Sequence, residues 1–281
     1  MELQTIYSED ELKKIQSIQL KCLKEIVSVC DAEGIEYFLI GGSALGAIRH
    51  NGYIPWDDDI DIAMPRQDYM RFLEIAEAKL SSCYHIQSPY NEKHCPYYYS
   101  KIRIDNTVFM EYCNRNLPIH HGVYVDVFPY DNVPDNEDLN IKQFDRCQQL
   151  TRKFANRQIP DVCSKPSGLI GTIRAIVRRF VYYIYSFTSY EKLIKQLDEE
   201  FTRYNNTDTR AMACLNFPKR KAEYALKSDI YPLVKHKFED TEFNIPRNYD
   251  AYLTSHYGNY NELPPKEQRY GHKPYKVDLG Q

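Results

Sequence analysis

Apolar residues recur every three or four positions after Ser8, and this spacing predicts an amphipathic helix over about 9–33. Ser8 and Glu11 have the Ser-x-x-Glu arrangement of a capping box, which is typical of a helix start. Gly34 supplies the matching signal for its end. The first element expected is therefore a capped helix with one buried face.

Two short apolar runs predict buried strands on either side of a glycine-rich turn. The run 35–40 leads into the Gly-Gly-Ser sequence at 41–43, where we expect a tight turn and a short helix capped by Ser43. The run 60–64 is the second expected strand. Pro65 should begin the next helix, because apolar side chains follow it at helical spacing.

More strands are expected in the stretch that follows this helix. The segments 97–104 and 107–112 are rich in β-formers, and the Asp-Asn pair between them predicts a two-residue hairpin. Residues 121–128 alternate again, which places Asp126 in the middle of a strand. A carboxylate in that position needs a partner or a metal ion.

The sequence from about 135 to 210 is helical and charged, and we interpret it as an insertion or accessory region of a single domain over residues 1–281. Its segment 169–187 has an apolar stripe, with Arg174 and Arg178 on another face. These arginines argue against a helix that crosses a bilayer. Packing on the core of the domain is the favoured interpretation, and peripheral membrane contact through 169–187 is the alternative.

The composition narrows the choice of partners and of compartment. A formal net charge of -3 argues against a protein built to bind nucleic acid. Charged residues stand where a secretory signal would be apolar, so we expect a cytoplasmic location, at the inner face of the membrane if the helix binds lipid. Eight cysteines without a Cys-x-x-Cys pair fit reduced thiols. A zinc site is a less favoured use for some of them, with the possible ligands Cys95, Cys113, His94, His120 and His121.

The strongest chemical signal is a group of carboxylates around the second expected strand. Asp59 and Asp61 are two residues apart on a strand, so their side chains point to the same side, and Asp57 joins them if the strand begins early. Like charges this close are unfavourable without a cation. Oxygen-only ligands suit Mg²⁺ or Mn²⁺, which share their coordination shell with substrate phosphates. A solvated acidic loop is the alternative.

The turn before this strand has features of a phosphate-binding site. Gly41 and Gly42 allow the backbone to come close to a ligand, and Ser43 adds a hydroxyl near the N–H groups of a helix start. Because this turn precedes the acidic strand at short range, we favour a metal and phosphate site over the solvated loop.

These motifs resemble those of the LicD family within the nucleotidyltransferase superfamily, whose members include relatives of fukutin-related protein. The turn at 41–43 followed by Asp59 and Asp61 is the superfamily signature. The longer similarity is carried by GGSALGAIRHNGYIPWDDDIDIAMPR, Lys101-Ile102-Arg103, HGVYVDVFPYD around Asp126, and the ending YGNYNELPPKEQRYGH. The resemblance implies an α/β (α+β) fold with a nucleotidyltransferase-like mixed β-sheet flanked by helices.

The resemblance also implies a reaction. LicD-like proteins transfer phosphocholine, or a related phospho-alcohol, from CDP-choline or another CDP-alcohol to a sugar hydroxyl of a glycan or lipid-linked glycan, and CMP is released. The expected acceptor is a cell-surface glycan, such as a teichoic acid or lipopolysaccharide precursor. Asp57, Asp59, Asp61 and Asp126 are the expected catalytic carboxylates. Asp59, Asp61 and Asp126 would hold the metal, and Asp126 or Asp57 would accept the proton of the acceptor hydroxyl.

Cationic and aromatic side chains complete the expected site. Arg49, Lys101 and Arg103 are candidates for phosphate contacts, and pairing with nearby acids is an equal alternative. By resemblance alone, His272 is expected to contact substrate. Tyr97 and Tyr99 share a strand face and suit a trimethylammonium group, although core packing explains them equally well.

Two other functions stay open. An ordinary nucleotidyltransferase would use a nucleoside triphosphate and release pyrophosphate instead of CMP. A non-catalytic nucleotide-binding protein is less favoured, because an idle cluster of partly buried carboxylates lowers stability.

Overall fold

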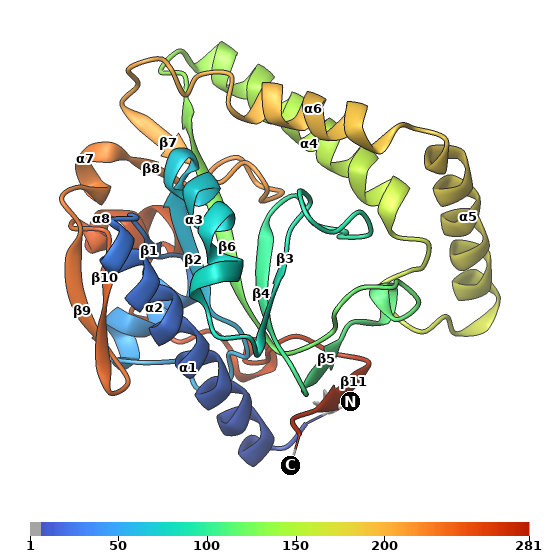
Figure 1. Ribbon diagram of the computed structural model, residues 1–281, viewed down its shortest axis with the longest axis horizontal. Coiled ribbons are helices and arrows are strands. Elements are labelled where there is room, and N and C mark those ends of the chain that lie inside the picture. The colour runs from blue at the N-terminus through green and yellow to red at the C-terminus, as the bar shows by residue number, and fades with distance from the viewer. Residues whose placement is uncertain (1–6, 281) are drawn as a thin grey trace.

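The computed structural model describes residues 7–280 and has a mixed sheet flanked by helices at its centre (Figure 1). The main strands, in their order across the sheet, are β1 (Phe38–Leu39), β2 (Asp61–Pro65), β6 (Tyr124–Val133), β4 (Ser100–Ile104) and β3 (Tyr84–Gln87). Among these neighbouring strands, β2 and β6 run parallel to each other and the other pairs are antiparallel. The far end of β6 pairs with β7 (Ala211–Ala213), which pairs in turn with β8 (Tyr224–Leu226). The mixed α/β architecture expected from the sequence is confirmed.

Three helices from the first third of the chain pack against this sheet. They are α1 (Glu9–Glu33), α2 (Gly41–His50) and α3 (Arg66–Lys79). The capping box of α1 is present, since the Ser8 hydroxyl accepts from the Glu11 N–H at 3.2 Å and the Glu11 carboxylate accepts from the Ser8 N–H at 2.7 Å. Gly34 ends the helix in the left-handed conformation.

Ser43 does not cap a helix, which corrects the sequence prediction. Helix α2 begins two residues earlier, and Ile40 holds the N-cap position without a side-chain hydrogen bond. Gly41 takes a positive φ of 53°, which lets the helix start directly after β1. The Ser43 hydroxyl instead accepts a hydrogen bond from the backbone N–H of Asp61 at 2.9 Å, so it ties α2 to the start of β2.

The predicted hairpin after residue 97 is also wrong. Strand β4 already has β3 on one edge and β6 on the other, so the next segment finds no free edge there. That segment, β5 (Val108–Met110), pairs with β11 (Lys276–Asp278) at the C-terminal end of the chain. A short 3-10 helix follows it at Tyr112–Asn114.

The region expected to be helical contains α4 (Glu137–Gln158), α5 (Gly168–Ser186) and α6 (Tyr190–Phe201). Helices α4 and α6 share a second apolar core with β7. Helix α5 does not follow the favoured prediction of core packing, because all nineteen of its residues are described and none is buried. It lies against α4 at the edge of the molecule (Figure 1).

Four further elements lie on the other side of the sheet from α5 (Figure 1). They are α7 (Lys227–Ile230), the two-stranded sheet of β9 (Val234–Phe238) and β10 (Thr241–Ile245), and α8 (Tyr249–Tyr257). A 3-10 turn follows at Lys266–Gln268. Across residues 7–280, no helix is both long and apolar enough to cross a membrane.

Candidate active site

Three neighbouring strands bring two carboxylates and an ammonium group together. The first residue of β2, Asp61, lies directly opposite Asp126 of β6. On the other side of β6, Asp126 lies opposite Lys101 of β4. Residues opposite one another in adjacent strands project from the same face of the sheet, so the register alone makes these three side chains neighbours.

Asp59 completes a triad of carboxylates with Asp61 and Asp126. One oxygen from each can be chosen so that all three lie within 4.8 Å of one another. Burial raises the pKa of Asp61 well above its usual value, and the charges of Asp59 and Asp126 add to this effect. Burial also raises the pKa of Asp126, against the opposing effect of Lys101. Converging oxygen donors with uncompensated repulsion fit a hard divalent cation such as Mg²⁺ or Mn²⁺.

Lys101 is the direct partner of Asp126. Its ammonium group donates to both carboxylate oxygens, at 2.6 and 2.9 Å. It also lies 3.5 Å from the ring centroid of Tyr124, and 4.9 and 5.4 Å from those of Tyr97 and Tyr99. The cation that contacts Tyr97 and Tyr99 in this structure is therefore Lys101, in agreement with the acid-pairing alternative.

The two arginines expected on phosphates are held by neutral groups. Arg103 donates to the side-chain carbonyl of Gln87 at 3.0 Å and to the backbone carbonyl of Gly122 at 2.8 Å. Arg49 of α2 donates to the backbone carbonyls of Tyr260 and Glu262, at 2.8 and 3.3 Å. Arg49 therefore joins the glycine-rich helix to the segment that follows α8.

Asp57 faces the start of α2. A Cβ atom on Gly42 would lie 2.7 Å from one of the Asp57 carboxylate oxygens, so a larger residue here would force the Asp57 side chain to move. Burial is the largest cause that raises the pKa of Asp57 well above its usual value, and Asp59 is the next. Gly42 thus leaves the space beside the helix N-terminus that the Asp57 carboxylate occupies.

Asp58 is a residue of this motif that sequence reasoning missed. It is almost fully buried, and His272 Nδ1 lies 2.8 Å from its Oδ1 atom, while Tyr7 donates to its other oxygen. Burial opposes ionisation, yet the bonds and charge of His272, with the bond from Tyr7, hold the pKa of Asp58 below its usual value. The hydrogen bond to Asp58 is the main cause that raises the pKa of His272 to about 9.

His272 thereby connects the closing motif to the acidic motif. Its Nδ1 atom also lies 3.7 Å from a carboxylate oxygen of Asp59. The side chain stays about half exposed. Aspartates 57 and 59 are neighbours of Asp58 in the chain, so this ion pair fixes the loop that carries them. The run of three consecutive aspartates was the only sequence signal for this role.

A second missed acid, Glu223, lies behind the glycine-rich turn. Its carboxylate accepts from the hydroxyls of Tyr130 at 2.6 Å and Tyr252 at 2.5 Å, and burial raises its pKa. The Tyr252 hydroxyl in turn accepts from the Gly41 N–H at 3.3 Å. The position that a Cβ of Gly41 would occupy is 3.5 Å from both Glu223 and Asp61. Glu223 falls in a stretch without a recognisable motif, so no local pattern pointed to it.

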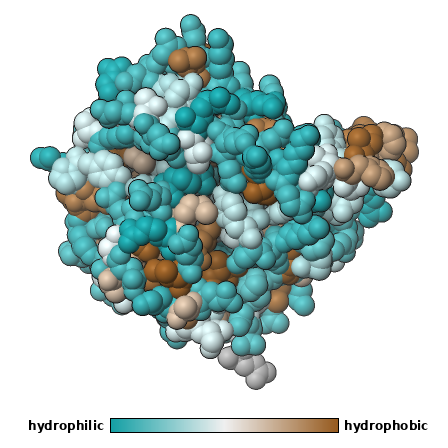
Figure 2. Space-filling model, turned by 45° about the horizontal axis from the view of Figure 1, so that its top comes forward, coloured by the Kyte–Doolittle hydropathy of each residue, from teal (hydrophilic) through white to brown (hydrophobic). Residues whose placement is uncertain are grey.

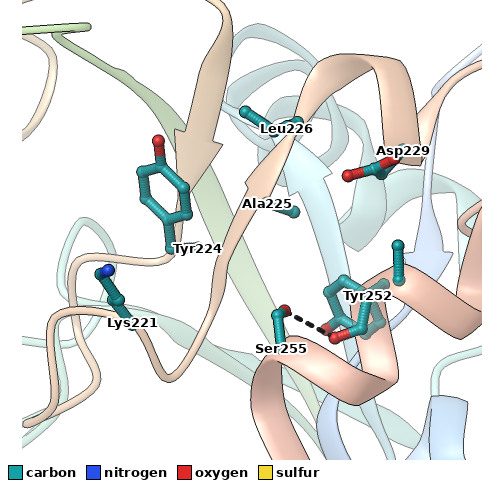
Figure 3. A pocket seen from close by; sticks show the side chains of 8 residues that line it. Lys221, Tyr224, Ala225, Leu226, Asp229, Tyr252 and Ser255 are labelled. Atoms are coloured by element: carbon teal, nitrogen blue, oxygen red, sulfur yellow. Dashed lines mark hydrogen bonds between the residues drawn. The ribbon is translucent and has the colours of Figure 1, made fainter.

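A cavity of about 300 Å³ opens between β8, α7 and α8 (Figure 3). Its lining includes Lys221, Tyr224, Asp229, Tyr252 and Ser255. Tyr252 therefore belongs both to this cavity and to the hydrogen bonds that hold Glu223 and Gly41.

Potential metal-binding clusters in the described residues contain no cysteine. The two groups close enough to share an ion are Asp59, Asp61 and Asp126, and Asp58, Asp59 and His272. The zinc alternative built on cysteines and other histidines is therefore not supported within residues 7–280.

Residues 34–166 match the family described as LicD/FKTN/FKRP, nucleotidyltransferase domain. The chain contains a LicD-family nucleotidyltransferase domain. All four acidic-motif residues and Asp126 fall within the matched range, whereas Glu223 and His272 lie outside it. The family expected from the motifs is confirmed.

Three proteins with similar sequences support this family assignment. The lipopolysaccharide cholinephosphotransferase LicD of Haemophilus influenzae is 26% identical over 271 residues, which cover 95% of this chain and 96% of that protein. The human ribitol 5-phosphate transferase FKRP is 45% identical over 53 residues, covering 17% of this chain and 11% of FKRP. An uncharacterised protein of Rickettsia typhi, RT0683, is 28% identical over 153 residues, covering 54% of this chain and 44% of that protein. The similarity to LicD is thus of full length, and that to FKRP is local.

Proposed function

We propose that this chain transfers phosphocholine, or a closely related phospho-alcohol, from a CDP-linked donor to a sugar hydroxyl of a cell-surface glycan precursor, with release of CMP. The observation that carries the proposal is the convergence of Asp59, Asp61 and Asp126, together with full-length similarity to a cholinephosphotransferase. Both named transferases above move a phosphate group that bears an alcohol, which favours this reaction over transfer of a nucleotide.

The triad fits Mg²⁺ or Mn²⁺, which when bound would supply a positive charge for the two phosphates of the donor. Asp59, Asp61 and Asp126 are the proposed ligands. The start of α2 lies close to Asp61, since a Cβ atom on Gly41 would be 3.5 Å from its carboxylate, and a helix N-terminus carries a partial positive charge.

In the proposed reaction, the acceptor hydroxyl oxygen forms a bond to the phosphorus that carries the alcohol. The bond from that phosphorus to the oxygen bridging to CMP breaks, and CMP leaves with the electron pair. The hydroxyl proton passes to a carboxylate. We assign this role to Asp57, because both oxygens of Asp126 already accept from Lys101.

His272 and Asp58 act as positioning residues in this scheme. Their ion pair connects the closing segment to the loop of Asp57 and Asp59, and the same ion pair leaves the imidazole about half exposed beside Asp59. Lys101 favours the charged form of Asp126, against the burial that raises the pKa of this carboxyl.

Titration calorimetry with CDP-choline, with and without Mg²⁺, tests the donor and the metal together. We expect Mg²⁺-dependent binding by the wild type and its loss in Asp59→Asn/Asp61→Asn. If the protein binds another CDP-alcohol but not CDP-choline, the proposed reaction still holds with a different alcohol as the transferred group. Binding of CTP alone, with no affinity for any CDP-alcohol, would contradict the proposed donor class.

A further inference from the structure

The face of α5 that points away from the protein is its apolar one. Leu169, Phe180 and Phe187 have 77%, 64% and 75% of their surface exposed. The other large apolar side chains on this face are also exposed, namely Ile170, Ile173, Ile176, Val177, Tyr183 and Ile184. They form the apolar patch on the projecting lobe at the right of Figure 2. A contiguous patch of this kind usually marks an interaction site.

The opposite face of α5 holds the helix in this orientation. Gly171, Ala175, Arg178 and Tyr182 follow one another at helical spacing and are partly covered. The Arg178 guanidinium donates to the backbone carbonyls of Ala155 at 2.8 Å and of Ile159 at 2.6 Å, at the C-terminal end of α4. The helix therefore directs its small and polar side inward and its apolar side outward, the reverse of an ordinary surface helix.

The charges around the apolar face are of one sign. The sequence has no Asp or Glu from Val162 to Tyr190, but it has Lys165, Arg174, Arg178 and Arg179. At 100° per residue, Arg174 and Arg179 lie on opposite flanks of the apolar face. Arg179 has a partner in Asp161 at 3.2 Å, whereas the described part of the chain supplies no ion-pair partner for Arg174.

We propose that α5 is a docking helix for the surface of an anionic membrane. An apolar face flanked by arginines, with aromatic residues along it, is the chemistry of a helix that lies in the lipid interface. A second copy of the chain fits this face less well. Symmetrical pairing would place the arginines of two helices near one another in a segment that has no acid to neutralise them. This proposal does not depend on the reaction proposed above.

Vesicle flotation of the full chain without substrates tests the proposal. The probe is vesicles of phosphatidylcholine alone and of phosphatidylcholine with about a third phosphatidylglycerol. The apolar variant is Ile176→Ser/Phe180→Ser, and the charge variant is Lys165→Gln/Arg174→Gln. The matched control is Leu139→Ser/Leu263→Ser, which removes two exposed apolar side chains elsewhere. Arg178 stays unchanged in every variant because it fixes α5 to α4.

The wild type and the control should float with the anionic vesicles and much less with the neutral ones. We expect the apolar variant to lose more than tenfold in partitioning and the charge variant about fivefold per residue. Circular dichroism should show an unchanged fold. Wild-type binding that is negligible, or that the apolar variant leaves intact, would overturn the proposal. A dimer in sedimentation velocity that Ile176→Ser/Phe180→Ser dissociates, without vesicle binding, would assign the face to a second copy instead.

Discussion

Lys101 of β4 donates to both carboxylate oxygens of Asp126 on the neighbouring strand, and both side chains are at least 93% buried. The pair stands at one edge of the carboxylate triad. It supplies one fixed positive charge on the Asp126 side of the triad, and His272 is a second cationic side chain, with its Nδ1 atom 3.7 Å from a carboxylate oxygen of Asp59.

Removal of this ammonium group should destabilise the fold. Lys101→Met leaves a buried carboxylate without its partner, and such a change costs about 3–5 kcal/mol in the free energy of unfolding. Urea unfolding in EDTA measures it. The control is Lys79→Met, which breaks the exposed pair with Glu33 and should cost less than about 1 kcal/mol. Equal losses in the two variants would show that Lys101 does not stabilise Asp126.

Divalent cations should stabilise the wild type through the triad. A cation that binds only the folded state raises the free energy of unfolding by about 2.7 kcal/mol at a hundred times its dissociation constant. Thermal unfolding with Mg²⁺ or Mn²⁺ should therefore shift upward in the wild type and stay unchanged in Asp59→Asn/Asp61→Asn. In EDTA the variant should be at least as stable as the wild type, because it has lost mutual repulsion. The control variant is Asp145→Asn/Glu199→Gln, which changes two exposed acids outside the triad. Its melting temperature should rise with the cation as that of the wild type does.

Much of this site could be predicted from the sequence, because its acids lie in local patterns. Strand alternation and the capping box depend on neighbouring residues, so they were evident. Lys101 and Asp126 were both candidates, but their pairing depends on the register of β4 against β6. Asp58 and Glu223 were missed because their partners are His272, Tyr130 and Tyr252, which are 214, 93 and 29 residues away.

Two of the failed predictions, the hairpin after residue 97 and the core packing of α5, have a common cause. Local pattern showed where a strand or helix lies but not which surface remains for it. Strand β5 cannot pair with β4, because β3 and β6 occupy both edges of that strand. Helix α5 stays outside the second apolar core, which α4 and α6 form with β7.

The His272 ion pair should make stability depend on pH. Its folded pKa of about 9 exceeds the unfolded value of about 6.5, so the stabilisation is complete below about pH 6.5 and is lost as pH rises through 9. The difference in melting temperature between the wild type and His272→Gln should narrow from pH 6.5 to 10. The control is His236→Gln on strand β9, whose imidazole contacts a backbone carbonyl at 3.1 Å instead of a carboxylate. A constant difference for His272→Gln would contradict a charged pair.

The Tyr252 hydroxyl should matter for substrate as well as for stability. Tyr252→Phe and Tyr130→Phe each remove one donor to Glu223, and each should cost about 1–3 kcal/mol in unfolding experiments. Only Tyr252 also bonds the Gly41 N–H at the start of α2. We therefore expect Tyr252→Phe alone to weaken donor binding in calorimetry. Equal donor affinity in the two variants would show that the Tyr252 hydroxyl does not contribute to donor binding.

The identity of the leaving group tests the central claim most directly. The protein is incubated with Mg²⁺, CDP-choline and the glycolipid fraction of cells that produce it, and phosphorus NMR identifies the products. The account predicts free CMP and choline joined to the glycan by a phosphodiester, both absent with Asp61→Asn. Pyrophosphate released from CTP, with the nucleotide attached to the acceptor and CDP-choline left intact, would contradict it.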